Sequence, residues 1–299
     1  MLDTDSPLAR HPVQTLEHLP LSVRDKVLVL AECVEGSDGV YPLNEQALLD
    51  LDHGGRHLLV DEGDRLVGYA SNRDSAAQIL VDPSRRRLGI AKAILSALQQ
   101  EDGDTELWAF GDLPPARSFC VNQGFHPVRG ILVMERSGGG DLRTESQVTI
   151  SRYEPQDMVD IQRVNSRAFK AHPEQGGMTL EDFRVRMEAP WFDPQGLLVA
   201  RNETGEVVGF HWTKIEQDYG EVYVLAVDPD AAGAGVGGAL LEAGLAYLES
   251  RGVARVRLWV DAHNDRAIVL YHRFGFTAIR RDVRYRRVGA DRRITGSVG

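Results

Sequence analysis

The feature that most constrains this chain is an internal repeat. The sequence ILVDP at residues 79–83 returns as LAVDP at residues 225–229, and Gly89 and Gly235 follow the two copies at the same distance. The two glycines are 146 residues apart, as are the prolines that end the repeated pentapeptides. A period of this length in a 299-residue chain predicts two copies of one domain-sized fold in tandem.

The segment between the copies supports this division. Residues 137–146 are rich in glycine and polar side chains and lack apolar periodicity, which is typical of a flexible linker. We place the boundary near residue 142 and predict domains at 1–142 and 143–299. At roughly 150 residues, each half is long enough to form its own hydrophobic core.

The hydrophobic pattern predicts an α/β fold with a mixed sheet in each half. In the second half we expect helices over 155–169, 179–188, 236–250 and 265–273, and strands over 196–202, 207–216, 221–227, 254–260 and within 276–288. The basic run from Arg280 to Arg293 alternates over residues 282–286. We interpret that part as an edge strand with solvated charges, rather than as a binding arm.

Composition excludes several classes of function. The chain has 34 Lys and Arg against 44 Asp and Glu, a net charge of −10, and its first 275 residues contain no basic block, so we expect no nucleic-acid partner. No stretch approaches 18 apolar residues, and we expect no membrane span or signal peptide. Two cysteines are typical of a reducing compartment, and we expect a cytoplasmic protein. The sequence leaves the oligomeric state open, with a monomer as the working expectation.

The repeated segment is a candidate phosphate site. In each copy a predicted strand ends in Val-Asp-Pro, glycines follow, and a helix begins, which places several backbone N–H groups in one concavity at the positive end of the helix dipole. The glycines permit φ angles and close backbone approach that other residues resist. The second copy contains GAGVGG over 233–238, but neither a Rossmann unit nor a P-loop surrounds it.

Taken together, these motifs resemble the GNAT N-acetyltransferase superfamily. Val-x-Pro, then Arg/Gln-x-x-Gly-x-Gly/Ala, and then a late helix ending in Gly-Phe are similar to its acetyl-CoA signature, present here twice. The first half has Arg86 at the start of the loop motif, whereas the second half has Ala232 there. The resemblance implies two tandem GNAT-like domains that bind acetyl-CoA as co-substrate through the end of the strand, the glycine loop and the helix start. The implied contacts of the first half are Ile79, Leu80, Val81, Arg87, Gly89 and Ala91. Those of the second half are Leu225, Ala226, Val227, Ala232, Gly233, Ala234, Gly235, Val236, Gly237, Gly238, Asn264 and Arg266. Asn264 has a second interpretation as a helix N-cap.

A narrower resemblance rests on five stretches. Residues 38–45, 172–177, 191–194, 209–214 and 220–225 are similar to the mycothiol synthase family, tandem GNAT enzymes of actinobacteria, and the likeness runs over about residues 20–288. The Arg-rich composition agrees with such a GC-rich source. The resemblance implies acetylation of the cysteinyl amine of cysteinyl-glucosaminyl-inositol, a small thiol-containing amine, by acetyl-CoA to give mycothiol.

Acetyl transfer to an amine needs a base, a donor for the oxyanion, and an acid for the departing thiolate. Glu221, on the strand that leads into the glycine loop, is the candidate base, and its alternative is a solvated or salt-bridged rim carboxylate. Tyr271, five residues before Phe276, occupies the position of the superfamily's general acid, and its alternative is a packed core tyrosine. A backbone N–H within residues 225–227 would meet the oxyanion.

The corresponding positions of the first half suit neither role. Ser75 lies eight residues before Pro83, as Glu221 lies before its proline, and Cys120 lies where Tyr271 does. Serine is not a base, and Cys120 is interpreted as a small buried residue rather than a nucleophile. We therefore predict that catalysis belongs to the second half, and that the first half binds CoA without chemistry or serves as scaffold.

The resemblance also assigns acceptor contacts. They fall on Glu45, Glu174, Lys214 and Trp259, where Trp259 replaces the family's tyrosine, and because Glu45 belongs to the first half the substrate would lie between the domains. Taken alone, each charged residue of this set is more simply a solvated surface charge. No cluster of histidines, cysteines and carboxylates has metal-ligand spacing, and we expect no metal. Two alternatives stay open: a tandem GNAT enzyme for another small amine, and a catalytically silent acyl-CoA-binding sensor.

Overall fold

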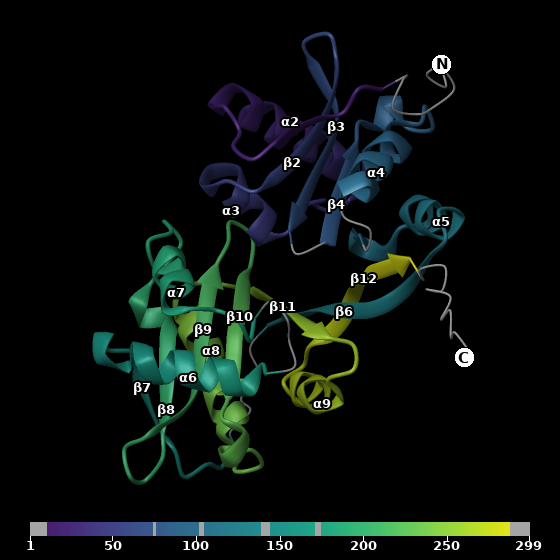
Figure 1. The fold of residues 1–299 in the computed structure, drawn as a ribbon. Helices are drawn as coiled ribbons and strands as arrows, with labels where there is room; N and C mark the ends of the chain where they lie inside the picture. Colours follow the sequence, from purple (N-terminus) through teal and green to yellow (C-terminus); the bar gives the residue numbers. More distant parts are fainter. Residues whose placement is uncertain (1–10, 74–75, 102–104, 139–143, 171–174, 288–299) are drawn as a thin grey trace, which may run out of the picture. The chain divides into compact units, whose positions relative to one another are not determined.

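The computed structural model describes residues 11–73, 76–101, 105–138, 144–170 and 175–287. It divides into two compact units (Figure 1). Unit 1 contains residues 1–131 and 281–299, and unit 2 contains residues 132–280. The predicted boundary near residue 142 lies outside the described residues, so the division into domains 1–142 and 143–299 stays a prediction. The chain crosses from one unit to the other twice, at residues 131–132 and 280–281, and both crossings lie inside strands.

Unit 1 is an α/β unit whose sheet has the strand order β1-β2-β3-β4-β5-β12. Its elements are β1 (Gln14–Leu16), α2 (Leu21–Asp38), α3 (Glu45–His53), β2 (Arg56–Glu62), β3 (Arg65–Arg73), β4 (Ala76–Val81), α4 (Ile90–Glu101), β5 (Glu106–Ala109), α5 (Pro114–Asn122), the first part of β6 (Phe125–Ser137) and the last part of β12 (Thr277–Arg287). Helix α4 packs against β2, β3 and β4 in one core, and α2 with α3 packs in a second core.

Unit 2 repeats this plan with the strand order β6-β11-β10-β9-β8-β7. Its elements are β7 (Thr149–Arg152), α6 (Met158–Ala168), α7 (Leu180–Met187), β8 (Leu197–Arg201), β9 (Val207–Ile215), β10 (Gly220–Val227), α8 (Val236–Ser250), β11 (Arg255–Asp261) and α9 (Asp265–Arg273), with the remaining parts of β6 and β12. The bounds of α8 and α9 are those predicted from the sequence.

The two faces of the unit 2 sheet are covered by different helices. Helix α8 packs on β8, β9 and β10, where Leu240 and Leu241 are fully buried, because its apolar residues recur on one side of the helix. Helices α6 and α7 cover the opposite face, and an aromatic cluster around Trp212 fills that core. None of the helices in the described ranges is long and apolar enough to span a membrane.

One sequence expectation about unit 1 is wrong. Residues 282–286 do not form a solvated edge strand, because β12 pairs with β5 and lies between β5 and β6 in the strand order. Its charges have partners: Asp282 is buried and accepts a hydrogen bond from the Gly111 N–H at 2.7 Å, and Glu106 of β5 pairs with Arg284 and Arg286. The alternating charges therefore belong to an interior strand, whose arginines Arg284 and Arg286 are neutralised by Glu106 of the neighbouring strand.

A buried histidine sits beneath α8. His211 is fully buried, its Nδ1 donates to the Leu240 carbonyl at 2.8 Å, and burial lowers its pKa to about 4. Helix α8 approaches the ring closely at Gly244, where a Cβ would lie 2.1 Å from the Nδ1 and Cε1 atoms of His211. This glycine is therefore required by packing.

The substitution Gly244→Ala tests that close approach. We expect it to lower the free energy of unfolding by about 2 kcal/mol, since overpacking against a buried ring exceeds the gain in helix propensity. Gly36→Ala in α2 is the matched control, because nothing lies within 4 Å of its Cβ position. Thermal unfolding should show a lower Tm for the first variant only. An unchanged Tm in Gly244→Ala would contradict the packing described.

The buried imidazole also predicts a pH dependence of stability. Below about pH 6.5 the unfolded chain protonates this ring, whereas the folded protein does so only near pH 4. The free energy of unfolding should therefore fall by up to about 3 kcal/mol as the pH drops through this window. Denaturant titrations should show a flatter profile for His211→Asn and an unaltered one for His263→Asn, which changes an exposed histidine. Parallel profiles for His211→Asn and wild type would refute the assignment.

Candidate active site

The candidate site of unit 2 begins where two parallel strands separate. Strands β10 and β11 are paired at Gly220–Val256 and Glu221–Arg257 only, whereas β10 remains paired with β9 as far as Val227. The backbone groups of residues 222–227 on the β11 side are thus outside the sheet's hydrogen bonding. Extended backbone of this kind can accept an added strand-like ligand. In unit 1, β4 and β5 separate in the same way, after Ala76–Glu106 and Ala77–Leu107.

A β-bulge in β10 distinguishes unit 2 from unit 1. The pairing of β10 with β9 shifts between Val222 and Val224, so Tyr223 is the extra residue. In unit 1, β4 pairs with β3 without a shift. The bulge directs Tyr223 and Val224 into the aromatic core beneath α6 and α7, and returns Leu225 to the α8 face. One strand thereby supplies side chains to both cores close to the point of separation.

Glu221 lies half-buried at that point, in a charged and aromatic setting. It is directly opposite Lys214 of β9, whose Nζ is 2.6 Å from Glu216 Oε1 and 4.8 Å from the Trp191 ring centroid. Burial, then the charges of Glu221 and Glu216, raise the pKa of Tyr219. A half-buried carboxylate in this position is placed to act as a general base towards an amine, directly or through a water molecule.

Tyr271 lies in α9, within the core cluster that contains Val222 of β10 and Leu258 of β11. The ring is buried, with a T-shaped contact to Phe276 at 5.8 Å between centroids. Among the residues that the structure describes, none hydrogen-bonds the Tyr271 hydroxyl. Desolvation raises the pKa of this phenol, so that it keeps its proton. The tyrosine is therefore packed in the core with its hydroxyl proton in place, and its role as the general acid stays a prediction.

The glycine loop of unit 2 has the backbone of an anion site. After the short turn 229–231, Gly233 and Gly235 adopt φ angles of 98° and 74°, and Gly235 is the N-cap of α8. Asp228 holds the turn, since its Oδ1 accepts from the Asp230 N–H at 3.0 Å and its Oδ2 is 3.0 Å from Arg163 Nη1. The N–H groups of the first turn of a helix favour phosphate.

Unit 1 has the same loop, but with an arginine at one of the two positions that have a positive φ. Arg87 and Gly89 adopt φ angles of 66° and 97° at the repeat positions of Gly233 and Gly235. A non-glycine residue in the left-handed region costs on the order of 1 kcal/mol. Asp82 holds this turn as Asp228 does, accepting from the Ser84 N–H at 2.9 Å. The loop geometry is therefore common to both units, including the one without a candidate base.

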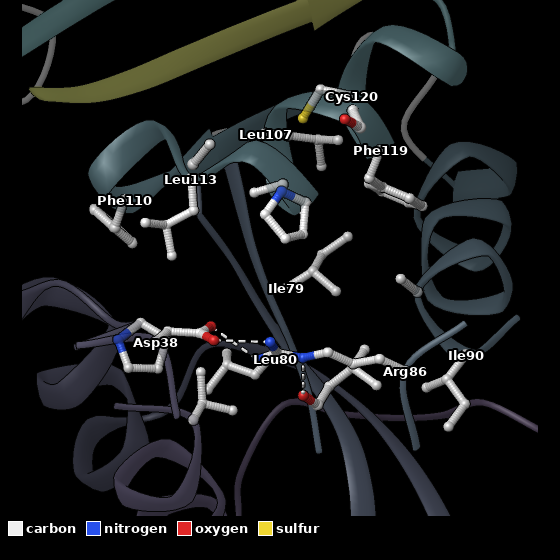
Figure 2. A pocket seen from close by; sticks show the side chains of 18 of the residues that line it. Asp38, Ile79, Leu80, Arg86, Ile90, Leu107, Phe110, Leu113, Phe119 and Cys120 are labelled. Atoms are coloured by element: carbon white, nitrogen blue, oxygen red, sulfur yellow. Dashed lines mark hydrogen bonds and ion pairs between the residues drawn. The ribbon is translucent and has the colours of Figure 1, made fainter. Parts of the chain in front are cut away.

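A cavity of about 880 Å³ occupies the separation of strands in unit 1. Strands β4 and β5 and helices α4 and α5 line it, and the predicted contacts Ile79, Leu80, Val81, Arg87, Gly89 and Ala91 all face it. Figure 2 shows Arg86 and Asp38 meeting on one side, with both guanidinium-to-carboxylate distances 2.8 Å, and Phe119 and Cys120 on the other. The arginine retained at the start of the first motif is thus engaged by a carboxylate of α2.

Cys120 is buried, as predicted, and burial raises the pKa of its thiol to about 12. It stays protonated at neutral pH and is a poor nucleophile. Ser75 and Glu174 lie outside the described residues. In those that are described, no group of three or more histidines, cysteines and carboxylates is placed to hold a metal ion.

The predicted acceptor contacts, and the two predicted CoA contacts of α9, come from several elements. Glu45 is in the first turn of α3 in unit 1, whereas Lys214 and Trp259 belong to unit 2, where Trp259 is 39% exposed on β11. Asn264 caps α9 by accepting from the Ala267 N–H at 3.2 Å, and Arg266 is exposed. The acceptor and CoA contacts of these residues stay predictions.

Sequence reasoning missed the residues that shape the surroundings of Glu221. Arg186 Nε donates to the Tyr223 hydroxyl at 3.0 Å, and the Tyr223 ring contacts Trp191 and Trp212. Arg257 stacks over Tyr219 and its Nε is 2.6 Å from Glu135 Oε2. The aromatic residues themselves were visible in the sequence, but their convergence depends on the bulge and on strand register.

Two comparisons identify the fold and the type of domain. Residues 160–276 match the family model described as the acetyltransferase (GNAT) family. A solved tandem GNAT protein from the clavulanic acid biosynthesis pathway aligns with a TM-score of 0.72 and 16% identity, over 94% of this chain and 100% of its own. The predicted α/β fold with two tandem GNAT-like halves is confirmed, and residues 160–276 belong to a GNAT acetyltransferase domain.

Curated relatives narrow the family. Mycothiol acetyltransferase of Thermomonospora curvata is 44% identical over 274 residues, which cover 87% of this chain and 92% of the relative. Mycothiol acetyltransferase of Propionibacterium freudenreichii subsp. shermanii is 40% identical, over 92% of this chain and 93% of the relative. The chain belongs to the mycothiol acetyltransferase family, as the sequence resemblance predicted.

Proposed function

We propose that this protein transfers the acetyl group of acetyl-CoA to the cysteinyl amine of cysteinyl-glucosaminyl-inositol, giving mycothiol, in the cytoplasm. GNAT acetyltransferases use acetyl-CoA, and the names of the relatives support the acceptor. The observation that carries the proposal is the placement of Glu221 and Tyr271 at the separation of β10 and β11. A catalytically silent sensor would need neither side chain.

In the proposed reaction Glu221 accepts a proton from the acceptor's ammonium group, directly or through water. The neutral amine then attacks the thioester carbonyl, so that a C–N bond forms and the C–S bond breaks. Backbone N–H groups of residues 225–227 stabilise the negative charge on the carbonyl oxygen. Tyr271 donates its proton to the departing thiolate, and the nitrogen of the tetrahedral intermediate releases its second proton to solvent. Solvent then returns a proton to the Tyr271 oxygen and removes the one on Glu221. The products are an amide and free CoA.

We propose that unit 2 alone is catalytic. The support is chemical, because the bulge and the protonated tyrosine occur in unit 2, whereas unit 1 has an unshifted β4 and a buried thiol at the corresponding place. The unit 1 cavity and glycine loop suit acyl-CoA, and we propose that it binds there without reacting. Glu45, Glu174, Lys214 and Trp259 are the proposed acceptor contacts.

The first test is acetylation of the purified acceptor. Mass spectrometry should detect acetylated product from wild-type protein and acetyl-CoA, a readout chosen because the acceptor's own thiol would react with thiol dyes. Glu221→Gln should lower turnover about 10- to 1,000-fold, since it removes the base while keeping the shape. Ser75→Ala, at the position eight residues before the repeated proline of the first half, should leave turnover unchanged. Equal turnover in the two variants would refute the assignment of Glu221.

The second test separates chemistry from packing. Tyr271→Phe removes one hydroxyl and should lower kcat about 10- to 100-fold without lowering Tm, because that hydroxyl has no hydrogen bond to lose within the described structure. Tyr247→Phe should show the opposite pattern, since the Tyr247 hydroxyl donates to Asp193 Oδ2 at 2.7 Å and lies in the packed end of α8. Wild-type kcat in Tyr271→Phe would exclude it as the acid.

A further inference from the structure

A short segment of unit 2 lies against the start of α8. Residues 144–146 pass so close that a Cβ at Gly235 would be 2.6 Å from the Glu145 carbonyl oxygen, and one at Gly238 would be 2.8 Å from Thr144 Cγ2. The Thr144 N–H donates to Glu242 Oε2 at 2.7 Å, which fixes the segment to the helix. The Ser146 hydroxyl donates to the Ala234 carbonyl at 3.1 Å.

The first unit makes the same contact with a different residue. His11 Nε2 donates to the Leu88 carbonyl at 2.9 Å, and Leu88 occupies the repeat position of Ala234. His11 lies three residues before β1, and Ser146 lies three residues before β7, so both contacts come from the approach to the first strand of a unit. The same backbone carbonyl of the glycine loop is therefore hydrogen-bonded in both units, by a histidine in one and a serine in the other.

Because the peptide bond is planar, this hydrogen bond also determines the direction of the next backbone N–H. The carbonyl of Ala234 and the N–H of Gly235 belong to one trans peptide group and point in opposite directions. Holding the carbonyl toward Ser146 therefore directs the Gly235 N–H away from Ser146, to the other side of the loop. Gly235 has a positive φ, so its peptide would otherwise have unusual freedom to rotate.

We infer that Ser146 is a positioning residue for the glycine loop of unit 2, which orients the Gly235 N–H toward the diphosphate of the acyl-CoA donor. His11 has the same role in unit 1. The inference rests on the proposed function, because it takes acyl-CoA as the ligand of the loop. It also gives Gly235 and Gly238 a second requirement, since both must lack a Cβ to admit residues 144–146.

A pair of acetyl donors tests this role. Acetyl-CoA contains the diphosphate and S-acetylpantetheine lacks it, so loss of positioning should affect only the first. For Ser146→Ala we expect the KM for acetyl-CoA to rise about threefold to tenfold, the size of one hydrogen bond, with kcat within about twofold of wild type. The kcat/KM for S-acetylpantetheine should not change. Ser146→Thr keeps the hydroxyl and should restore the KM.

Ser250→Ala is the matched control. The Ser250 hydroxyl also donates to a backbone carbonyl, that of Tyr247 at 2.6 Å, but at the far end of α8. It should leave both donors unaffected. An equal loss with both donors in Ser146→Ala would show a merely structural role and overturn the inference, as would an unchanged KM for acetyl-CoA.

A binding measurement keeps the inference separate from the proposed acceptor. Isothermal titration of acetyl-CoA into wild type and Ser146→Ala needs no acceptor, and it should show weaker binding at one site of the variant. If wild type binds acetyl-CoA but does not acetylate cysteinyl-glucosaminyl-inositol, the acceptor is wrong and the positioning role is still measured. If wild type does not bind acetyl-CoA, the proposed function and the inference both fail.

Discussion

Where β10 and β11 stop pairing after Glu221, the backbone groups of the next residues must find partners other than a neighbouring strand. The other elements of the candidate site lie beside these backbone groups. The glycine loop begins at the free end of β10, α9 brings Tyr271 beside the same strands, and Glu221 marks the last paired position. An extended donor whose own amides pair with β10 would lie beside Glu221, Tyr271 and the glycine loop.

The bulge at Tyr223 turns this common scaffold into two chemically different units. In unit 1 the unshifted pairing places Gln78 opposite Ser71, and Gln78 Oε1 accepts from the backbone N–H of Asn44 at the start of α3. In unit 2 the extra residue directs Tyr223 toward Trp191 and Trp212, beside Glu221. A repeat can therefore keep its fold and its glycine loop while one inserted strand position changes the side chains beside the point where the strands separate.

Much of the fold could be predicted because its signals are local. The apolar spacing and the flanking glycines gave α8 and α9 their bounds, and the repeat offset paired Gly89 with Gly235. Strand order is not a local property, and so residues 282–286 were predicted to form an edge strand, although Glu106 pairs with Arg284 and Arg286 in the interior of the sheet. The contact of Ser146 with the glycine loop could not be predicted either, because it joins residues 88 positions apart through a backbone carbonyl.

The passage of β6 and β12 between the units affects the order in which the protein can be completed. Unit 1 contains residues 283–286, paired with β5, which are synthesised after the whole of unit 2. Domains usually fold in order as they leave the ribosome. Here the first unit lacks a strand until all of unit 2 has emerged, whereas unit 2 contains every one of its strand residues by position 280. Unit 1 therefore cannot complete its sheet before unit 2 has been synthesised.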